Sequence, residues 1–235
     1  MPTPDGAPTA GRHVLVVADG DVPSRADLDA AWPGWDDAVE AVIAADGGLA
    51  RARALDVEPT LLVGDLDSLD PALIAAAEAS GPPIRRSPAA KDESDAELAL
   101  LAALDEGATR LTVLGAFGGP RLDHALANVW LLAHPALDGL AVTLLDARTR
   151  ASLLTAPGPD GAPVRRPLPG PLGATVSLLP FGGDATGVTT HGLRYPLHDE
   201  PLQVGPARGL SNVREAADAA VMLRAGRLLV IEIAP

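Results

Sequence analysis

The sequence contains no cysteine, which excludes a disulfide framework, a thiolate metal site and a cysteine nucleophile. Aromatic residues make up only 3% of the 235 residues, so a core must be built from alanine, leucine and valine. No apolar run reaches the length of a membrane-spanning helix, and the first dozen residues lack the apolar segment of a secretory signal. We therefore expect a cytoplasmic protein without a membrane partner.

Basic residues are also scarce, with 18 Lys and Arg against 31 Asp and Glu, and the formal net charge is -13. This balance argues against binding of duplex nucleic acid, where Lys and Arg must meet the phosphates. It does not exclude nucleotides, which an acidic site binds through a divalent cation. Hydrophobic residues reach 47%, enough for the core of one large domain or two small ones.

Short, continuously apolar runs in the first 147 residues are typical of strands buried in a parallel sheet. Such runs occur at 13–18, 38–45, 61–63, 111–114 and 141–145, with a weaker one around Ile84. Helices are expected at 49–55, 71–79 and 122–133, and from Ser94, where Glu97 completes a capping-box pattern. Alternating strands and helices predict an α/β domain, a Rossmann-like parallel sheet with helices on both faces.

After residue 147 the pattern changes. Residues 156–173 are dense in proline and glycine, and short strand-like runs such as 175–179 follow. The last two runs, 219–224 and 227–233, predict a hairpin across Ala225-Gly226. We expect two domains, 1–147 and 148–235, the second an all-β sandwich. The three tryptophans are expected to pack inside.

Two carboxylates stand one residue apart in Val63-Gly64-Asp65-Leu66-Asp67-Ser68, where a short buried strand ends. Residues i and i+2 of an extended chain point the same way, so Asp65 and Asp67 converge. Two such anions repel unless a cation lies between them, and Mg²⁺ with phosphates is the usual partner. A solvated acidic turn is the alternative.

Three other loops combine a carboxylate with glycine, a hydroxyl group or a cation. They are Asp46-Gly47-Gly48, Lys91 to Asp95, and Gly118-Gly119-Pro120-Arg121-Leu122-Asp123. The carboxyl ends of parallel strands share one edge of a sheet, and ligands bind there. Such an edge suits a magnesium–polyphosphate complex, with Lys91 and Arg121 stabilising phosphate charge. Neither a Walker A sequence nor G-x-G-x-x-G after the first strand is present.

These loops, together with Leu98-Ala99, His124 and Asn128, resemble the signature motifs of the thiamine pyrophosphokinase family. In the second half, Gly192-Leu193-Arg194-Tyr195-Pro196-Leu197 and Gly209-Leu210-Ser211-Asn212 resemble its carboxyl-terminal motifs. The resemblance covers nearly the whole chain in order. One departure is Pro120, which lengthens the usual Gly-Gly-Arg loop by one residue.

The resemblance implies transfer of pyrophosphate from ATP to thiamine, which gives thiamine diphosphate and AMP. It also implies a nucleotide-binding catalytic domain, a thiamine-binding β-sandwich, and a homodimer with active sites at the subunit interface.

The resemblance further implies roles for individual residues. Mg²⁺ is expected at Asp46, Asp65, Asp67 and Asp95, and the expected catalytic residues are Asp65, Asp67, Asp95 and Asp123. ATP phosphates are assigned to Asp46, Gly47, Ser68, Lys91, Gly118, Gly119 and Arg121. Thiamine is assigned to Tyr195, Ser211 and Asn212.

Two alternatives stay open from the sequence. One is the same chemistry on another alcohol, such as a hydroxymethylpterin. The other is a non-catalytic sensor of a nucleotide or of thiamine diphosphate. The sequence also does not choose the catalytic base among Asp65, Asp67 and Asp95.

Overall fold

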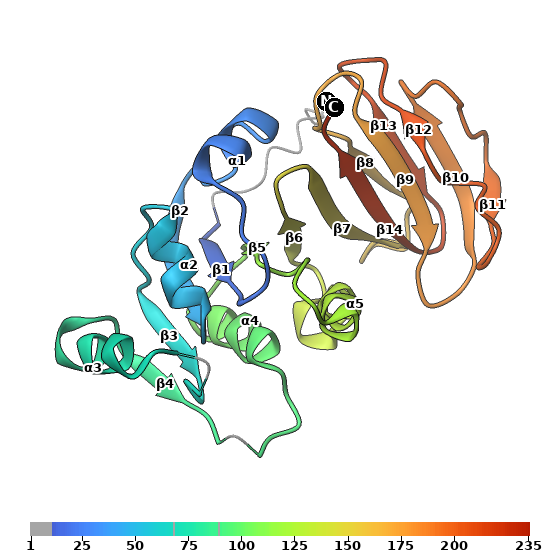
Figure 1. Ribbon diagram of the computed structural model, residues 1–235. Coiled ribbons are helices and arrows are strands. Elements are labelled where there is room, and N and C mark those ends of the chain that lie inside the picture. The colour runs from blue at the N-terminus through green and yellow to red at the C-terminus, as the bar shows by residue number, and fades with distance from the viewer. Residues whose placement is uncertain (1–10, 68, 89) are drawn as a thin grey trace. The chain divides into compact units, whose positions relative to one another are not determined.

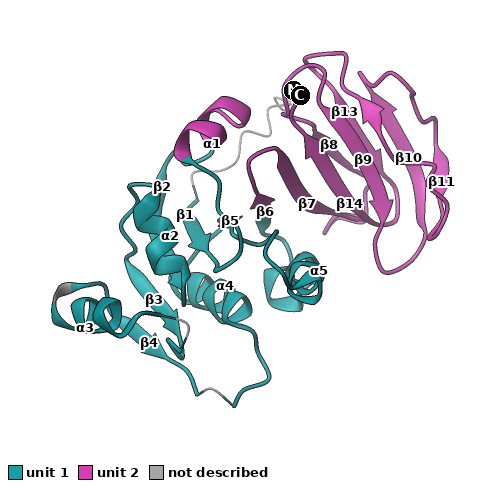
Figure 2. Cartoon of the chain, in the orientation of Figure 1, with its two compact units in different colours: residues 1–24, 34–142 teal, residues 25–33, 143–235 magenta. Residues whose placement is uncertain are grey.

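The computed structural model describes residues 11–67, 69–88 and 90–235, which divide into two compact units (Figure 2). The first unit contains residues 11–24 and Gly34–Val142, and the second contains Arg25–Pro33 and Thr143–Pro235. Among the described residues, none of the helices combines the length and apolar character needed to span a bilayer.

A parallel sheet forms the centre of the first unit, with the strand order β5-β1-β2-β3-β4 (Figure 1). The strands are β1 (His13–Val17), β2 (Val39–Ala45), β3 (Leu61–Gly64), β4 (Ile84–Arg86) and β5 (Arg110–Leu114). Every residue of β1 is buried, as expected for a continuously apolar strand covered on both sides. The predicted α/β architecture is confirmed, while the Rossmann-like description of its topology stays a prediction.

The helices of this unit connect its strands. They are α2 (Gly48–Ala54), α3 (Pro71–Ser80), α4 (Asp95–Asp105) and α5 (Leu122–Leu131), followed by the 3₁₀ turn η1 (Pro135–Leu137). As predicted, α4 begins after Ser94, whose hydroxyl accepts the Glu97 N–H at 3.2 Å. α4 packs against β1, β2 and β3 mainly through alanines, whose small side chains allow a close approach. α5, which is described in full, buries none of its residues.

The strands of the second unit are antiparallel. Five of them belong to a ten-stranded sheet, in which they have the order β12-β9-β14-β7-β6, and the other four form a separate sheet with the order β11-β10-β13-β8. The first contains β6 (Ala141–Leu145), β7 (Thr149–Ala156), β9 (Thr175–Pro180), β12 (Asn212–Val213) and β14 (Gly226–Ile233). The second contains β8 (Val164–Pro167), β10 (Ala185–His191), β11 (Glu200–Leu202) and β13 (Ala220–Leu223). Leu154, Leu178 and Leu228 of the first sheet share one core with Val188 and Val221 of the second.

The predicted terminal hairpin is wrong. β13 pairs with β8 and β10, whereas β14 pairs with β7 and β9, so the turn carries the chain from one sheet to the other. Gly226 makes this possible with a φ of 101°, and a Cβ there would lie 2.7 Å from the Asp184 carbonyl oxygen. Both strands send side chains into the same core, so their alternating patterns resemble those of a hairpin.

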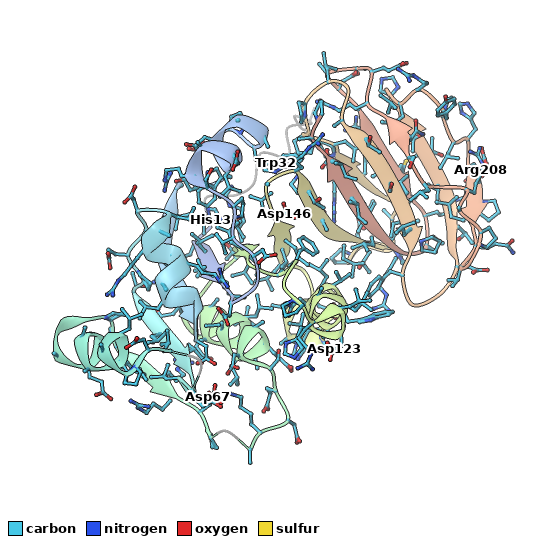
Figure 3. All side chains as sticks on the ribbon, in the orientation of Figure 1. His13, Trp32, Asp67, Asp123, Asp146 and Arg208 are labelled. Atoms are coloured by element: carbon cyan, nitrogen blue, oxygen red, sulfur yellow. The ribbon has the colours of Figure 1, made fainter. Side chains whose placement is uncertain are left out.

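A short helix, α1 (Arg25–Ala31), was not predicted and belongs to the second unit. After it, the Trp32 indole donates to the Asp146 carbonyl oxygen at 3.0 Å (Figure 3). The Arg150 guanidinium lies 4.9 Å from the centre of the Trp32 ring. Trp32 and Trp35 are buried as expected, but Trp130 is 57% exposed, so that part of the prediction is wrong.

Candidate active site

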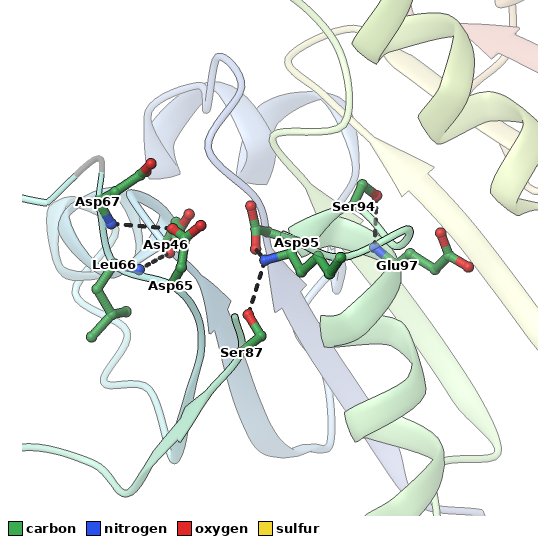
Figure 4. Close-up of polar contacts among 9 residues, drawn as sticks. Asp46, Asp65, Leu66, Asp67, Ser87, Ser94, Asp95 and Glu97 are labelled. Carbon is green, nitrogen blue, oxygen red and sulfur yellow. Dashed lines mark hydrogen bonds and ion pairs between the residues drawn. The ribbon is translucent and has the colours of Figure 1, made fainter. Parts of the chain in front are cut away.

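Three carboxylates meet at the carboxyl ends of β2 and β3. Because Ala45 pairs with Val63 in these parallel strands, the residues that follow them leave the sheet side by side. One oxygen each of Asp46, Asp65 and Asp67 lies within 4.8 Å of the other two (Figure 4). The structure thus brings together three of the four predicted magnesium ligands through loops about twenty residues apart.

Asp46 is the buried member of this cluster. It is 5% exposed, has a φ of 46°, and accepts the Leu66 N–H at 2.9 Å through Oδ1. Gly64 leaves room for it: a Cβ at residue 64 would lie 2.1 Å from Asp46 Oδ1, and φ there is 143°. The glycine ahead of Asp65 therefore has a packing role, since any side chain would displace the buried carboxylate.

Burial, together with the negative charges of Asp95 and Asp65, raises the pKa of Asp46 to about 6, against the opposing effect of the Leu66 hydrogen bond. Ionised Asp46 therefore needs a positive neighbour. The atoms of the cluster that can coordinate an ion are carboxylate oxygens, which are the ligands that Mg²⁺ prefers. The residues present fit such an ion.

Asp95 lies next to this cluster and is paired with the cationic side chain of Lys91. It lies in the first turn of α4, where Lys91 Nζ donates to Asp95 Oδ1 at 2.5 Å and to Ser87 Oγ at 2.9 Å. Burial lowers the pKa of Lys91, but its bond to Asp95 and the charges of Asp95, Asp65 and Asp46 outweigh this and raise it. The Lys91 side chain is only 11% exposed and stays positive beside the acids.

A pocket of about 450 Å³ opens beside the cluster, within the first unit. Among the predicted site residues, its lining includes Asp46, Asp67, Asp95, Gly118, Gly119 and Arg121. The ends of β1, β2 and β5 and the first turns of α4 and α5 therefore share one cavity. The lining therefore combines carboxylates with glycines and the cation Arg121.

Asp123 has a different setting. It lies outside the three-carboxylate group and forms a two-bond ion pair with Arg121, at 2.9 and 2.6 Å. Both side chains are exposed, and the bonds from Arg121 hold the pKa of Asp123 well below its usual range. Its catalytic role stays a prediction. Gly47 directly precedes α2, and Ser68 lies outside the described residues.

Sequence reasoning missed three polar residues at this edge. Asp19, after β1, lines the pocket, and Asp21 Oδ2 accepts the Gly119 N–H at 2.9 Å. The rule that ligands bind where strands end applies equally to β1 and would have found both. Ser87, which bonds Lys91 four residues later, directly follows β4, so the same rule applies to it, but the apolar signal of this short strand is weak.

The residues assigned to thiamine lie in the second unit. Tyr195 and Asn212 line a small pocket of about 80 Å³, and Tyr195 is 59% exposed. Ser211, next to Asn212, has a φ of 59° and donates its N–H to Ser177 Oγ at 3.1 Å. The residues that line this pocket come from a different part of the sequence than the residues of the acidic cluster.

An α/β unit with an acidic pocket at its strand ends, joined to an all-β unit, defines a class of proteins that handle phosphorylated ligands. The family model described as thiamin pyrophosphokinase, catalytic domain, matches residues 35–144. The model described as thiamin pyrophosphokinase, vitamin B1 binding domain, matches residues 165–228, so together they cover more than half of the chain. The chain belongs to the thiamin pyrophosphokinase family.

Individual relatives agree with this placement. The chain is 27% identical over 173 residues to thiamine pyrophosphokinase of Bacillus subtilis, covering 72% of this chain and 76% of that protein. A crystal structure of the Bacillus subtilis enzyme superposes with a TM-score of 0.79 at 24% identity, covering 95% and 99% of the chains. A thiamin pyrophosphokinase family protein from Enterococcus faecalis gives 0.74 at 27% identity and the same coverage.

Proposed function

We propose that this protein is an ATP-dependent thiamine pyrophosphokinase that transfers pyrophosphate from ATP to thiamine, giving thiamine diphosphate and AMP. The observation that carries the proposal is the convergence of Asp46, Asp65 and Asp67 beside the Lys91–Asp95 pair, at a pocket in the part that matches the family's catalytic domain. ATP is the co-substrate, and the enzyme is a transferase.

Magnesium is part of the proposal. Asp46, Asp65 and Asp67, with Asp95 nearby, would hold the ion, which neutralises phosphate charge when bound. Lys91, Arg121 and the Gly118-Gly119 backbone would bind the phosphates and keep the β-phosphorus in line with the attacking hydroxyl.

The reaction is a single displacement. The oxygen of the thiamine hydroxyl forms a bond to the β-phosphorus of ATP, and the bond from that phosphorus to the oxygen bridging to the α-phosphate breaks. AMP leaves with that oxygen. The hydroxyl proton passes to a carboxylate among Asp65, Asp67 and Asp95. Charge neutralisation and positioning then supply most of the rate enhancement.

We propose two domains, 1–147 for ATP and catalysis and 148–235 for thiamine, with Tyr195, Ser211 and Asn212 in the thiamine-binding part. The ranges matched by the catalytic and vitamin B1 binding models support this division. A Rossmann-like topology for the first domain and a cytoplasmic location stay predictions from the sequence.

We further propose a homodimer with active sites at the subunit interface. Supporting this, Leu122, Leu126 and Trp130 recur every four residues along α5 and are 72%, 52% and 57% exposed. Residues four apart lie on one face of a helix, so these three form an apolar stripe. α5 also carries pocket residues such as Asn128, so a second copy seated on the stripe would lie near the site.

The test is product formation. The purified protein is incubated with ATP, Mg²⁺ and thiamine, and AMP and thiamine diphosphate are measured by chromatography. We expect equal amounts of both products, none after chelation of the metal, and none when hydroxymethylpterin replaces thiamine. Formation of AMP with hydroxymethylpterin but not with thiamine would support a pyrophosphokinase that acts on the pterin instead. Tight ATP binding without AMP from any alcohol would support a sensor.

A further inference from the structure

The Asn212 side chain is bonded to the backbone of Tyr195 through both of its polar groups. Asn212 Nδ2 donates to the Tyr195 carbonyl oxygen at 2.6 Å, and the Tyr195 N–H donates to Asn212 Oδ1 at 2.9 Å. Oδ1 also accepts the N–H of Val213 at 2.9 Å. The oxygen of this amide has therefore used both of its lone pairs inside the protein.

The segment that carries Asn212 is itself fixed to the sheet. Asn212 pairs with Val176 of β9, the Ser211 N–H donates to Ser177 Oγ, and the Leu178 N–H donates to the Gly209 carbonyl oxygen at 2.9 Å. Ser177 is 4% exposed. The amide of Asn212 thus projects from a well-anchored edge of the sheet.

Tyr195, by contrast, lies in a connection outside the strands. The preceding residue, Arg194, donates its N–H to the Val213 carbonyl oxygen, and Leu197, two residues later, donates its N–H to Thr190 Oγ1. Between these points both the N–H and the carbonyl group of Tyr195 bond the Asn212 side chain. The exposed ring stands beside the small pocket, whose wall also contains Leu178, Leu197 and Leu210.

We propose that Asn212 is a positioning residue that acts through Tyr195. It fixes the Tyr195 backbone so that the ring forms one wall of the pocket for a flat, cationic heterocycle, and the amide itself does not contact the substrate. An aromatic face attracts such a ring by stacking and by cation–π interaction, and both depend on its orientation. The identity of the substrate rests on the proposed function, but the coupling of Asn212 to Tyr195 does not.

A spectroscopic test isolates this coupling. Tyr195 is the only tyrosine in the chain, so 3-fluorotyrosine labelling gives one ¹⁹F resonance from the folded protein. Without substrate, we expect Asn212→Ala to shift and narrow this resonance as the ring gains mobility. Asp160→Ala removes a comparable bond to a backbone N–H, that of Ala162, and is expected to leave the resonance unchanged.

Asn212→Asp is the second variant, for use if the alanine protein does not fold, since it keeps the acceptor oxygen and loses the Nδ2 donor. The same direction of change is expected. A resonance identical to that of the wild type in a folded Asn212 variant would overturn the proposal.

Steady-state kinetics tests the consequence for the substrate. We expect Asn212→Ala and Tyr195→Ala each to raise the KM for thiamine about tenfold, with the KM for ATP within about twofold of wild type. Because both changes remove the same wall, the double variant should be no worse than Tyr195→Ala alone. If the increases in KM of the two single variants instead multiply in the double variant, Asn212 contacts thiamine itself. A wild-type protein that forms no product would contradict the proposed function, while the ¹⁹F result would still decide the role of Asn212.

Discussion

The carboxylates at the acidic edge carry more negative charge than the nearby cationic side chain neutralises. Asp46, Asp65 and Asp67 offer oxygens within 4.8 Å of one another, and the nearby cation, Lys91, is bonded to Asp95. Like charges this close repel strongly when one of them is buried. The same repulsion provides the driving force for binding a cation that carries phosphates.

Replacing Asp67 tests this directly. Asp67→Asn removes one negative charge but keeps the size of the side chain, so the protein should fold normally. We expect kcat to fall about a hundredfold or more, because a metal–phosphate complex loses a charged ligand. Product formation at saturating ATP and thiamine measures it.

Asp105→Asn is the matched control, since that carboxylate pairs with Arg85 on the surface. It should retain wild-type turnover. An Asp67→Asn protein as active as this control would remove Asp67 from the site.

His13 is a buried histidine remote in function from the acidic edge. His13 Nδ1 lies 2.6 Å from Arg110 Nη2 and 3.0 Å from the Asp37 carbonyl oxygen, and Nε2 lies 2.9 Å from Thr112 Oγ1. Burial, reinforced by the positive charge of Arg110, holds the pKa of His13 below its usual value, although the Asp37 carbonyl oxygen and the acids Asp36 and Glu40 oppose this. The folded protein therefore keeps this histidine neutral.

This predicts a loss of stability in mild acid. The unfolded chain protonates His13 near pH 6.5 and the folded chain only at lower pH, so the contribution is complete above 6.5 and declines as pH falls below it. Each unit of pKa difference is worth about 1.4 kcal/mol. Urea unfolding at pH 7.5 and 5.5 should show a larger loss for wild type than for His13→Gln. Equal losses would mean that His13 does not titrate on unfolding.

At the scale of elements, the connection between β13 and β14 determines how the second unit closes its core. Val221 of β13 and Val230 of β14 lie in the same hydrophobic cluster although their strands belong to different sheets. The chain crosses between the sheets at Gly226. The conformation of this one residue therefore supports a packing arrangement that involves both sheets.

Substituting this glycine should be costly. Gly226→Ala introduces a Cβ 2.7 Å from a backbone oxygen, at a φ of 101° that alanine rarely adopts. We expect a loss of about 1–3 kcal/mol in the free energy of unfolding. Gly183→Ala, where a Cβ meets nothing within 4 Å, should change it little. Equal stabilities of the two variants in urea titrations would show that the crossing tolerates a side chain.

Elements with strong local signals were predicted well. β1 and β3 are apolar along most of their length, β2 ends in the buried apolar run 41–45, and the start of α4 has its Ser94 cap. α1 escaped prediction because it is only seven residues long, contains three charged residues, and buries only Leu28. Its place is decided by Trp32, whose partner Asp146 is more than a hundred residues away.

At the scale of the whole molecule, the apolar stripe on α5 bears on assembly. α5 buries none of its own residues, although Leu122, Leu126 and Trp130 share a face. Fully burying a leucine side chain is worth about 1.5–3 kcal/mol. A symmetric interface uses each residue twice, so the stripe has enough apolar surface to contribute substantially to a dimer.

We expect light scattering to give about twice the chain mass of 23.9 kDa for wild type. Leu126→Asp should reduce the mass to that of one chain, because it buries a charge in the interface. Leu172→Asp makes the same change at a leucine of similar exposure, 59%, in the second unit and should stay dimeric. A wild type of single-chain mass, or a dimeric Leu126→Asp, would contradict the proposed interface.

The sequence by itself determined where most strands and helices begin and which loops carry carboxylates, because burial patterns and caps depend on residues a few positions apart. It also placed Asp46, Asp65, Asp67 and Asp95 at the ends or starts of such elements. The tertiary structure alone decided that Asn212 holds Tyr195 and that β13 and β14 pair with different, more distant strands. Those outcomes depend on which distant segments the folded chain brings into contact, and patterns of neighbouring residues contain no information about such contacts.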